Sequence, residues 1–294
     1  MNIITMPIYQ NIHLENGTMN KLLIVFVHIF LLSQNDGWKQ IHNSREYSIS
    51  GIANFNDGYL VVHDNKKKNQ ARVSYINREL KINKLIWPEP KLPYDLESAV
   101  KIPGKMNRYI FMGSKGICYE VTVDPKDFRI DVLHTFTLPG LKPKMNLEGL
   151  TIYPSGQGLI FIYGNRGSDS ETSTLFTVFF NHKKKLFKDL NQFEYDLPIP
   201  KKHKRNFADL TLKEDGSIWT VATSDPGNNG PFTSAIYELG EINHAGTFIP
   251  IHPNLLKPIM VFSGQKVEAM VFHKGHLVLM TDNENFGSTF KLME

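Results

Sequence analysis

The sequence predicts an all-β protein: a five-bladed β-propeller of four-stranded blades, closed by an N-terminal strand. A short pattern occurs five times along the 294 residues. Each copy begins an apolar strand, which is followed by a turn and a second apolar strand. The copies lie roughly 50 to 60 residues apart, a spacing typical of propeller blades. They are Ser50-Gly51-Ile52-Ala53, Leu96-Glu97-Ser98-Ala99, Leu147-Glu148-Gly149-Leu150, Ala208-Asp209-Leu210-Thr211 and Val267-Glu268-Ala269-Met270.

Apolar runs of period two, separated by Gly, Pro, Asn and Asp, define the strands of each blade. The dipeptide Asp57-Gly58 is a strong hairpin signal in the first blade. The strands expected in blades 1 and 2 are Ser48–Phe55, Tyr59–His63, Arg72–Ile76, Leu80–Trp87, Ser98–Ile102, Arg108–Met112, Ile117–Val123 and Ile130–Thr137. Those of blades 3 and 4 are Gly149–Tyr153, Leu159–Tyr163, Thr174–Phe180, Phe193–Leu197, Leu210–Lys213, Ser217–Ala222, Ser234–Leu239 and Thr247–Ile251.

The fifth blade lacks one strand. Only Ala269–His273, His276–Thr281 and Thr289–Leu292 follow its anchor before the chain stops. The segment Trp38–Tyr47 has no blade of its own. Because an unpaired outer edge invites aggregation, we expect Trp38–Tyr47 to supply the missing outer strand and close the ring.

The N-terminal region resembles an export signal. From Met19 a short basic stretch is followed by the apolar run Leu22–Leu32, and Ser33 is small enough to precede a cleavage site. Residues 1–33 are therefore interpreted as an extension and signal peptide, with 34–294 as a single propeller domain. The start codon is Met1 or Met19, and the alternative is that the apolar run is a buried strand. The expected location is secreted or periplasmic, without stable membrane insertion after signal removal.

Composition excludes few functions. The net charge is +4, and the single cysteine, Cys118, allows no intramolecular disulfide or thiolate metal site. Basic runs such as Lys201–Arg205 are interpreted as solvated loops, since no aromatic residues interleave with them as stacking on nucleic acid requires. We expect a monomer that does not bind nucleic acid.

Carboxylates recur at one position of the repeat. Glu97, Glu148 and Glu268 begin three innermost strands, and Asp209 sits one place later in its own repeat. Because innermost strands line a propeller's central channel, these four acids are expected to converge on the axis. Hard oxygen ligands in that number suit Ca²⁺, so the four are predicted to bind it. The alternative is that they pair with Lys or Arg.

A second polar set lies where the second strand of each blade ends. That strand runs antiparallel to the first, so its end returns to the same mouth of the channel. Arg166 stands out because its planar fork can grip a carboxylate or phosphate, although it could instead neutralise Glu148 or Asp169. The predicted ligand-binding rim consists of Asp64, Asn165, Arg166, Asp225, Asp282 and Glu284.

The sequence contains motifs that resemble a known family. Asn146–Leu150, the turn Asp225–Phe232, and Val267–Met270 with Asp282–Gly287 are similar to bacterial exported propellers of the phytase-like type. The blade count also resembles that of calcium-activated nucleotidases. The resemblance implies the fold and an acidic central site that holds Ca²⁺, and it carries over no catalytic set.

The sequence is compatible with two functions. The first is an exported propeller whose acidic, Ca²⁺-binding channel takes a small anionic ligand or a protein partner. The second is a Ca²⁺-dependent hydrolase, a phosphoesterase or an esterase-like enzyme, that acts at the channel mouth. No Gly-x-Ser-x-Gly elbow and no HExxH spacing is present, and the Asn-Asp-Pro motif of five-bladed glycosidases is absent. The sequence therefore leaves open whether the protein is an enzyme.

Overall fold

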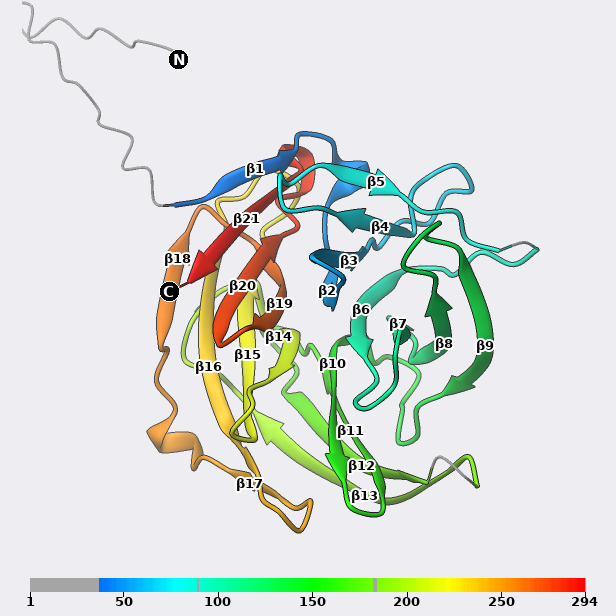
Figure 1. The fold of residues 1–294 in the computed structure, drawn as a ribbon. Helices are drawn as coiled ribbons and strands as arrows, with labels where there is room; N and C mark the ends of the chain where they lie inside the picture. Colours follow the sequence, from blue (N-terminus) through cyan, green and yellow to red (C-terminus); the bar gives the residue numbers. More distant parts are fainter. Residues whose placement is uncertain (1–36, 89, 182–183, 294) are drawn as a thin grey trace, which may run out of the picture. The chain divides into compact units, whose positions relative to one another are not determined.

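The computed structural model describes residues 37–88, 90–181 and 184–293. These residues form five antiparallel sheets around a central axis, so the predicted five-bladed propeller is confirmed (Figure 1). In blades 1 to 4 the strand nearest the axis comes first in the chain and the later strands lie further out, whereas the outermost strand of blade 5 comes from the N-terminal end of the described residues. Within the described residues no helix is long and apolar enough to cross a membrane.

The strands follow the predicted hairpins, with differences at the outer edges and at the innermost strand of blade 4, which begins at Lys204 and not at Leu210. Blades 1 and 2 contain β2 (Gly51–Phe55), β3 (Gly58–Val62), β4 (Val73–Ile76), β5 (Ile82–Lys84), β6 (Leu96–Lys101), β7 (Arg108–Gly113), β8 (Ile117–Val123) and β9 (Ile130–Thr137). Blade 3 contains β10 (Leu147–Ser155), β11 (Gly158–Asn165), β12 (Ser173–Asn181) and β13 (Leu186–Tyr195). Blades 4 and 5 contain β14 (Lys204–Leu212), β15 (Ser217–Ser224), β16 (Thr233–Ile242), β17 (Phe248–Pro250), β18 (Met260–Ser263), β19 (Val267–His273), β20 (His276–Thr281) and β21 (Ser288–Met293).

The N-terminal strand closes the ring as predicted. β1 (Lys39–His42) pairs with β21 and becomes the outer strand of blade 5. Gln40 fastens this edge because its side-chain amide donates to the carbonyl of Ser288 at 2.9 Å. Gly287 has a φ of +74°, and an added Cβ would lie 2.0 Å from the carbonyl oxygen of His42. The closure therefore requires glycine at this position.

Blade 4 has an outer edge that the sequence analysis did not anticipate. The short strand β17 covers only the Gly240–Ile242 end of β16, and β18 covers its Thr233–Ile236 end. Three short 3₁₀ helices complete the described elements: η1 (Arg45–Tyr47), η2 (Pro253–Leu255) and η3 (Glu284–Phe286).

The apolar core is divided among the interfaces between blades. Five clusters of buried side chains are present in the described residues, and each joins two neighbouring sheets. The three tryptophans contribute edge-on aromatic contacts across such interfaces: Trp38 with Phe262, Trp87 with Tyr119, and Trp219 with Phe272. Burial of this surface supplies most of the driving force for a closed ring.

The repeated motif brings the innermost strands close together. An added Cβ on Gly51 would lie 2.6 Å from the Cα of Ser98, and one on Gly149 would lie 2.7 Å from the backbone nitrogen of Leu210. Gly51 and Gly149 therefore have to be glycines, because neighbouring backbones meet there. At the opposite end of the axis the inner strands line a smaller cavity of about 180 Å³.

Candidate ligand-binding site

The three recurring glutamates are buried at one mouth of the channel. Glu97 is 8% exposed, Glu148 2% and Glu268 4%. The register shifts between Leu96 and Ser98, and equivalent shifts occur at the Glu148 and Glu268 anchors. Such bulges re-aim side chains, and here each one contains an acid of the repeat.

Asp209 has a different role from the three glutamates, because it binds backbone amides. Its carboxylate accepts hydrogen bonds from the backbone amides of Leu210 at 2.8 Å and Met270 at 2.6 Å. The Met270 bond joins blade 4 to blade 5. Ser98 makes the matching link from blade 2 to blade 3, because its hydroxyl accepts from the amide of Leu150 at 3.0 Å. The one-residue offset of Asp209 thus makes it the counterpart of Ser98, the residue after the acid.

The mouth of the channel contains a polar cavity of about 480 Å³. Five residues of the predicted rim line it: Asp64, Arg166, Asp225, Asp282 and Glu284. Asn165 has a structural contact instead, because its side-chain oxygen accepts from the amide of Asn146 at 2.9 Å. Other lining residues are Arg45, Lys66, Asp95, Glu97, Asn146, His203, Arg205, Pro226, Gly227, Asn228, Lys266 and Glu268.

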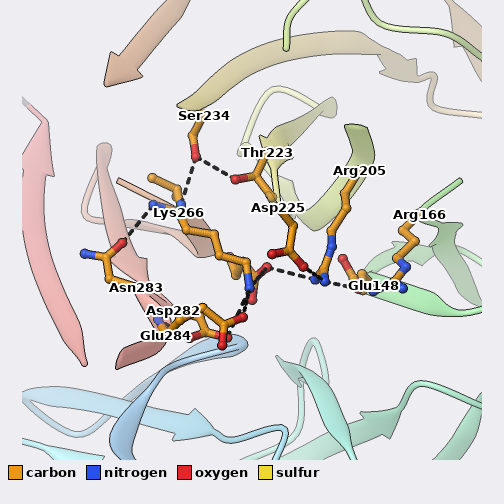
Figure 2. Close-up of polar contacts among 12 residues, drawn as sticks. Glu148, Arg166, Arg205, Thr223, Asp225, Ser234, Lys266, Asp282, Asn283 and Glu284 are labelled. Atoms are coloured by element: carbon orange, nitrogen blue, oxygen red, sulfur yellow. Dashed lines mark hydrogen bonds and ion pairs between the residues drawn. The ribbon is translucent and has the colours of Figure 1, made fainter. Parts of the chain in front are cut away.

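Arg205 connects three blades at the centre of this site (Figure 2). Its Nη1 atom lies 3.4 Å from Glu148 and 3.2 Å from Glu268, and its Nη2 atom binds Asp225. Burial would raise the pKa of Asp225, but the charges of Lys266 and Arg205 outweigh it and hold that pKa below the ordinary value. Arg205 therefore neutralises two of the four acids predicted to bind metal.

Lys266 forms a second ionic cluster. Its side chain is 1% exposed, and its Nζ lies 2.6 Å from Glu284, 3.2 Å from Glu268 and 3.4 Å from Asp282. Figure 2 shows the lysine extended toward Asp282 and Glu284. Burial raises the pKa of Asp282, but the charge of Lys266, hydrogen bonds from Ser48 and the backbone of Glu284, and the charge of Arg205 together outweigh it, so the pKa lies below the ordinary value of the group.

Arg166 has hydrogen-bonding capacity to spare. Its Nη1 atom donates to Glu148 at 2.9 Å, which realises the pairing that the sequence analysis gave as its alternative role. A guanidinium carries five N–H donors, and Nη1 is the one side-chain nitrogen of Arg166 engaged by a described residue. The side chain is 32% exposed and lines the cavity, so its remaining donors can receive a ligand.

Two carboxylates of the cavity have no hydrogen bond or ion pair to any described residue. They are Glu97 from β6 and Asp64, which follows β3. Burial raises the pKa of Glu97 well above its usual value, and the charge of Glu148 raises it further. Burial and the charge of Asp282 raise the pKa of Asp64 to about 6. This side of the cavity therefore carries two acids that form no direct ion pair with a described residue.

Sequence reasoning missed the two most connected cations. It placed Arg205 in a solvated basic loop, whereas Lys204–Leu212 is an innermost strand and Arg205 points into the site. Lys266 was not singled out. A usable signal was present, because Lys266 precedes Glu268 by two residues, and alternate residues of a strand share a face.

The predicted metal ligands do not form one cluster. Among the described residues, no group of three or more His, Cys, Asp or Glu side chains has an arrangement that could hold a metal ion. Glu148 and Glu268 contact Arg205, and Asp209 binds backbone amides. Of the four acids, Glu97 is left with an unengaged carboxylate, and the Ca²⁺ site stays a prediction.

Comparisons with known proteins support the fold. No family model matches the chain, and no curated protein is similar to it in sequence. Among solved structures, it is similar to an exo-1,5-α-L-arabinanase from a bovine ruminal metagenomic library, with 9% identity and a TM-score of 0.51. That match covers 83% of this chain and 92% of the arabinanase chain.

Two further solved structures are similar at lower scores. One comes from work on glycoside hydrolases of the GH130 family that target β-1,2 mannosidic linkages in Candida mannan, with 9% identity, 83% coverage of both chains and a TM-score of 0.46. The other is a protein from Lactobacillus plantarum, with 11% identity, coverage of 79% of this chain and 76% of that chain, and a TM-score of 0.41. At these identities the likeness shows the propeller fold alone, and the phytase-like resemblance stays a prediction.

Proposed function

We propose that the protein binds a small ligand with an anionic group in the central cavity, where Arg166 holds that group. The observation that carries this proposal is an arginine with unused donors on the wall of a polar cavity. A volume of about 480 Å³ lies within the range of roughly 300–1,000 Å³ common for small-molecule sites. A small molecule is therefore favoured over a protein partner.

Calcium belongs to the same proposal as a companion of the ligand. Glu97 and Asp64 offer unengaged carboxylate oxygens of the hard type that Ca²⁺ prefers. Together they supply at most four oxygens, and Ca²⁺ takes about six to eight, so ligand or water oxygens would complete the shell. Glu148 and Glu268 would have to leave Arg205 before they could join.

A hydrolase is the second candidate function, and Glu97 favours it. Its raised pKa keeps the carboxylic acid protonated closer to neutral pH, which is the state that a general acid needs. In a phosphoester or carboxyl ester bound at Arg166, such an acid would protonate the leaving oxygen while water attacks.

The test is ligand binding by the full chain and two matched arginine variants. Thermal shift and calorimetry would be run with a panel of phosphomonoesters, nucleotides and small carboxylates. Arg166→Met should lose the response, whereas Arg129→Met, at an exposed arginine that pairs with Asp131, should keep it. Failure of every panel member to bind, or equal binding by Arg166→Met, would overturn the proposal. Turnover of the same panel with Ca²⁺ or chelator decides between binding protein and hydrolase.

A further inference from the structure

The paired and unpaired charges of the cavity wall, judged on the described residues, come from different blades. The five cations on its wall all lie in ion pairs with described acids: Arg45, Lys66, Arg166, Arg205 and Lys266. The acids that blades 3, 4 and 5 contribute here all form ion pairs with these cations. The exceptions, Asp64 and Glu97, come from blades 1 and 2. One side of the cavity thus has carboxylates to spare, and Arg166 of blade 3 has donors to spare.

Glu97 is important to this arrangement because its carboxylate is buried and has no partner among the described residues. Only 8% of the residue is exposed, and it lines the cavity. A buried charge without a partner is costly, so a carboxylate in this place calls for a proton or a cation. Asp95 shows the contrast nearby, since Lys66 binds it at 2.9 Å.

We infer that the ligand is a small zwitterion, with an ammonium group on Asp64 and Glu97 and a carboxylate or phosphate on Arg166. This inference rests on the proposed function and names its substrate class. An ammonium group carries three N–H donors, and two carboxylates can accept hydrogen bonds from them. Ca²⁺ would need about six to eight oxygen ligands, which is more than these two acids supply. A ligand charged at both ends satisfies both unused sets at once, and a simple anion satisfies one.

The experiment is a calorimetric series on the full chain with α,ω-amino acids from glycine to aminohexanoate. Each is compared with the alkylamine and the alkanoate of the same length. One length should bind at least about tenfold more tightly than either single-charge analogue, because it alone spans the two groups. Glu97→Gln and Asp64→Asn should each weaken binding of the zwitterion by about tenfold and leave binding of the alkanoate unchanged. Glu171→Gln, at an exposed acid, is the control, and circular dichroism confirms folding of each variant.

The outcomes separate the inference from the function on which it rests. Alkanoates that bind as tightly as the amino acids, with loss of binding in Arg166→Met, would overturn the zwitterion and leave the anion site standing. Displacement of the amino acids by millimolar Ca²⁺, without release by alkylamines, would assign the acids to metal and also overturn it. No binding of any phosphomonoester, carboxylate or amino acid would remove both.

Discussion

The Nη2 atom of Arg45 lies 2.6 Å from Oε2 of Glu284, while Lys266 holds the other oxygen of the same carboxylate. Arg45 belongs to η1, just after the closing strand β1, and Glu284 begins η3. The segment that closes the ring therefore also contributes a cation to the cavity wall. Ring closure and the wall of the cavity are thereby connected through one carboxylate.

Closure should fail when glycine is replaced at the tightest point of that junction. In Gly287→Ala, the new methyl group meets the His42 carbonyl, so β1 must move away from β21. We expect a loss of about 1–3 kcal/mol of unfolding free energy and more aggregation of the exposed edge. Gly104→Ala is the control, because it has a φ of +70° and nothing within 4 Å of the new atom. Equal melting temperatures of the two variants would contradict the role of the junction.

Lys266→Met should be among the most destabilising single substitutions at the site. It leaves Glu268, Asp282 and Glu284 without the cation they share, and breaking a buried ion pair typically costs about 3–5 kcal/mol. Urea denaturation measures the change. Lys188→Met, at an exposed position of β13, should remain within about 0.5 kcal/mol of the parent. A small effect of Lys266→Met would show that the acids neutralise themselves by protonation.

Asp64→Asn should change how stability depends on pH. The folded protein raises the pKa of Asp64 to about 6 from 3.8, so the folded state binds this proton more tightly than the unfolded chain. Its contribution to stability is present at low pH and is lost as the pH rises through about 4 to 6. The variant should gain up to about 3 kcal/mol relative to the parent between pH 4 and pH 7. Thermal melts at several pH values measure the difference, and a constant difference would refute the shift.

Glu148→Gln distinguishes the two roles that the sequence left open for this acid. Because Glu148 is buried against Arg166 and Arg205, we expect a loss of about 1–3 kcal/mol whether Ca²⁺ or chelator is present. Bound metal would act differently: Ca²⁺ at a hundredfold above its dissociation constant stabilises the fold by about 2.7 kcal/mol. A melting temperature of the parent that rises with Ca²⁺, and no longer rises in Glu148→Gln, would restore the metal role.

Export concerns residues outside the described part of the structure. If the run Leu22–Leu32 is a signal peptide, expression from Met19 should release a shortened chain that begins near Gln34. Intact-mass measurement of secreted or periplasmic material tests this. A product that stays full-length in the cytosol would end the secreted or periplasmic assignment.

The sequence alone determined the blades, their order and the mouth at which the polar residues gather. Strand alternation and hairpin turns are local signals, and the direction of each strand follows from the hairpin before it. Asp64, Arg166, Asp225, Asp282 and Glu284 could therefore be placed together on one mouth without coordinates. The missing strand of blade 5 was equally predictable, because an open edge has to be covered.

Only the tertiary structure decided which charges meet. Arg205 contacts Glu148, which is 57 residues earlier, and Glu268, which is 63 residues later. Ion pairing depends on separations of a few ångströms between different blades, and no periodicity along the chain encodes it. Asp209, offset by one residue in its repeat, binds backbone amides, while Glu97 and Asp64 have no partner in the described part of the chain. The division of the cavity into a paired and an unpaired side, on which the ligand proposal depends, arises from ring closure.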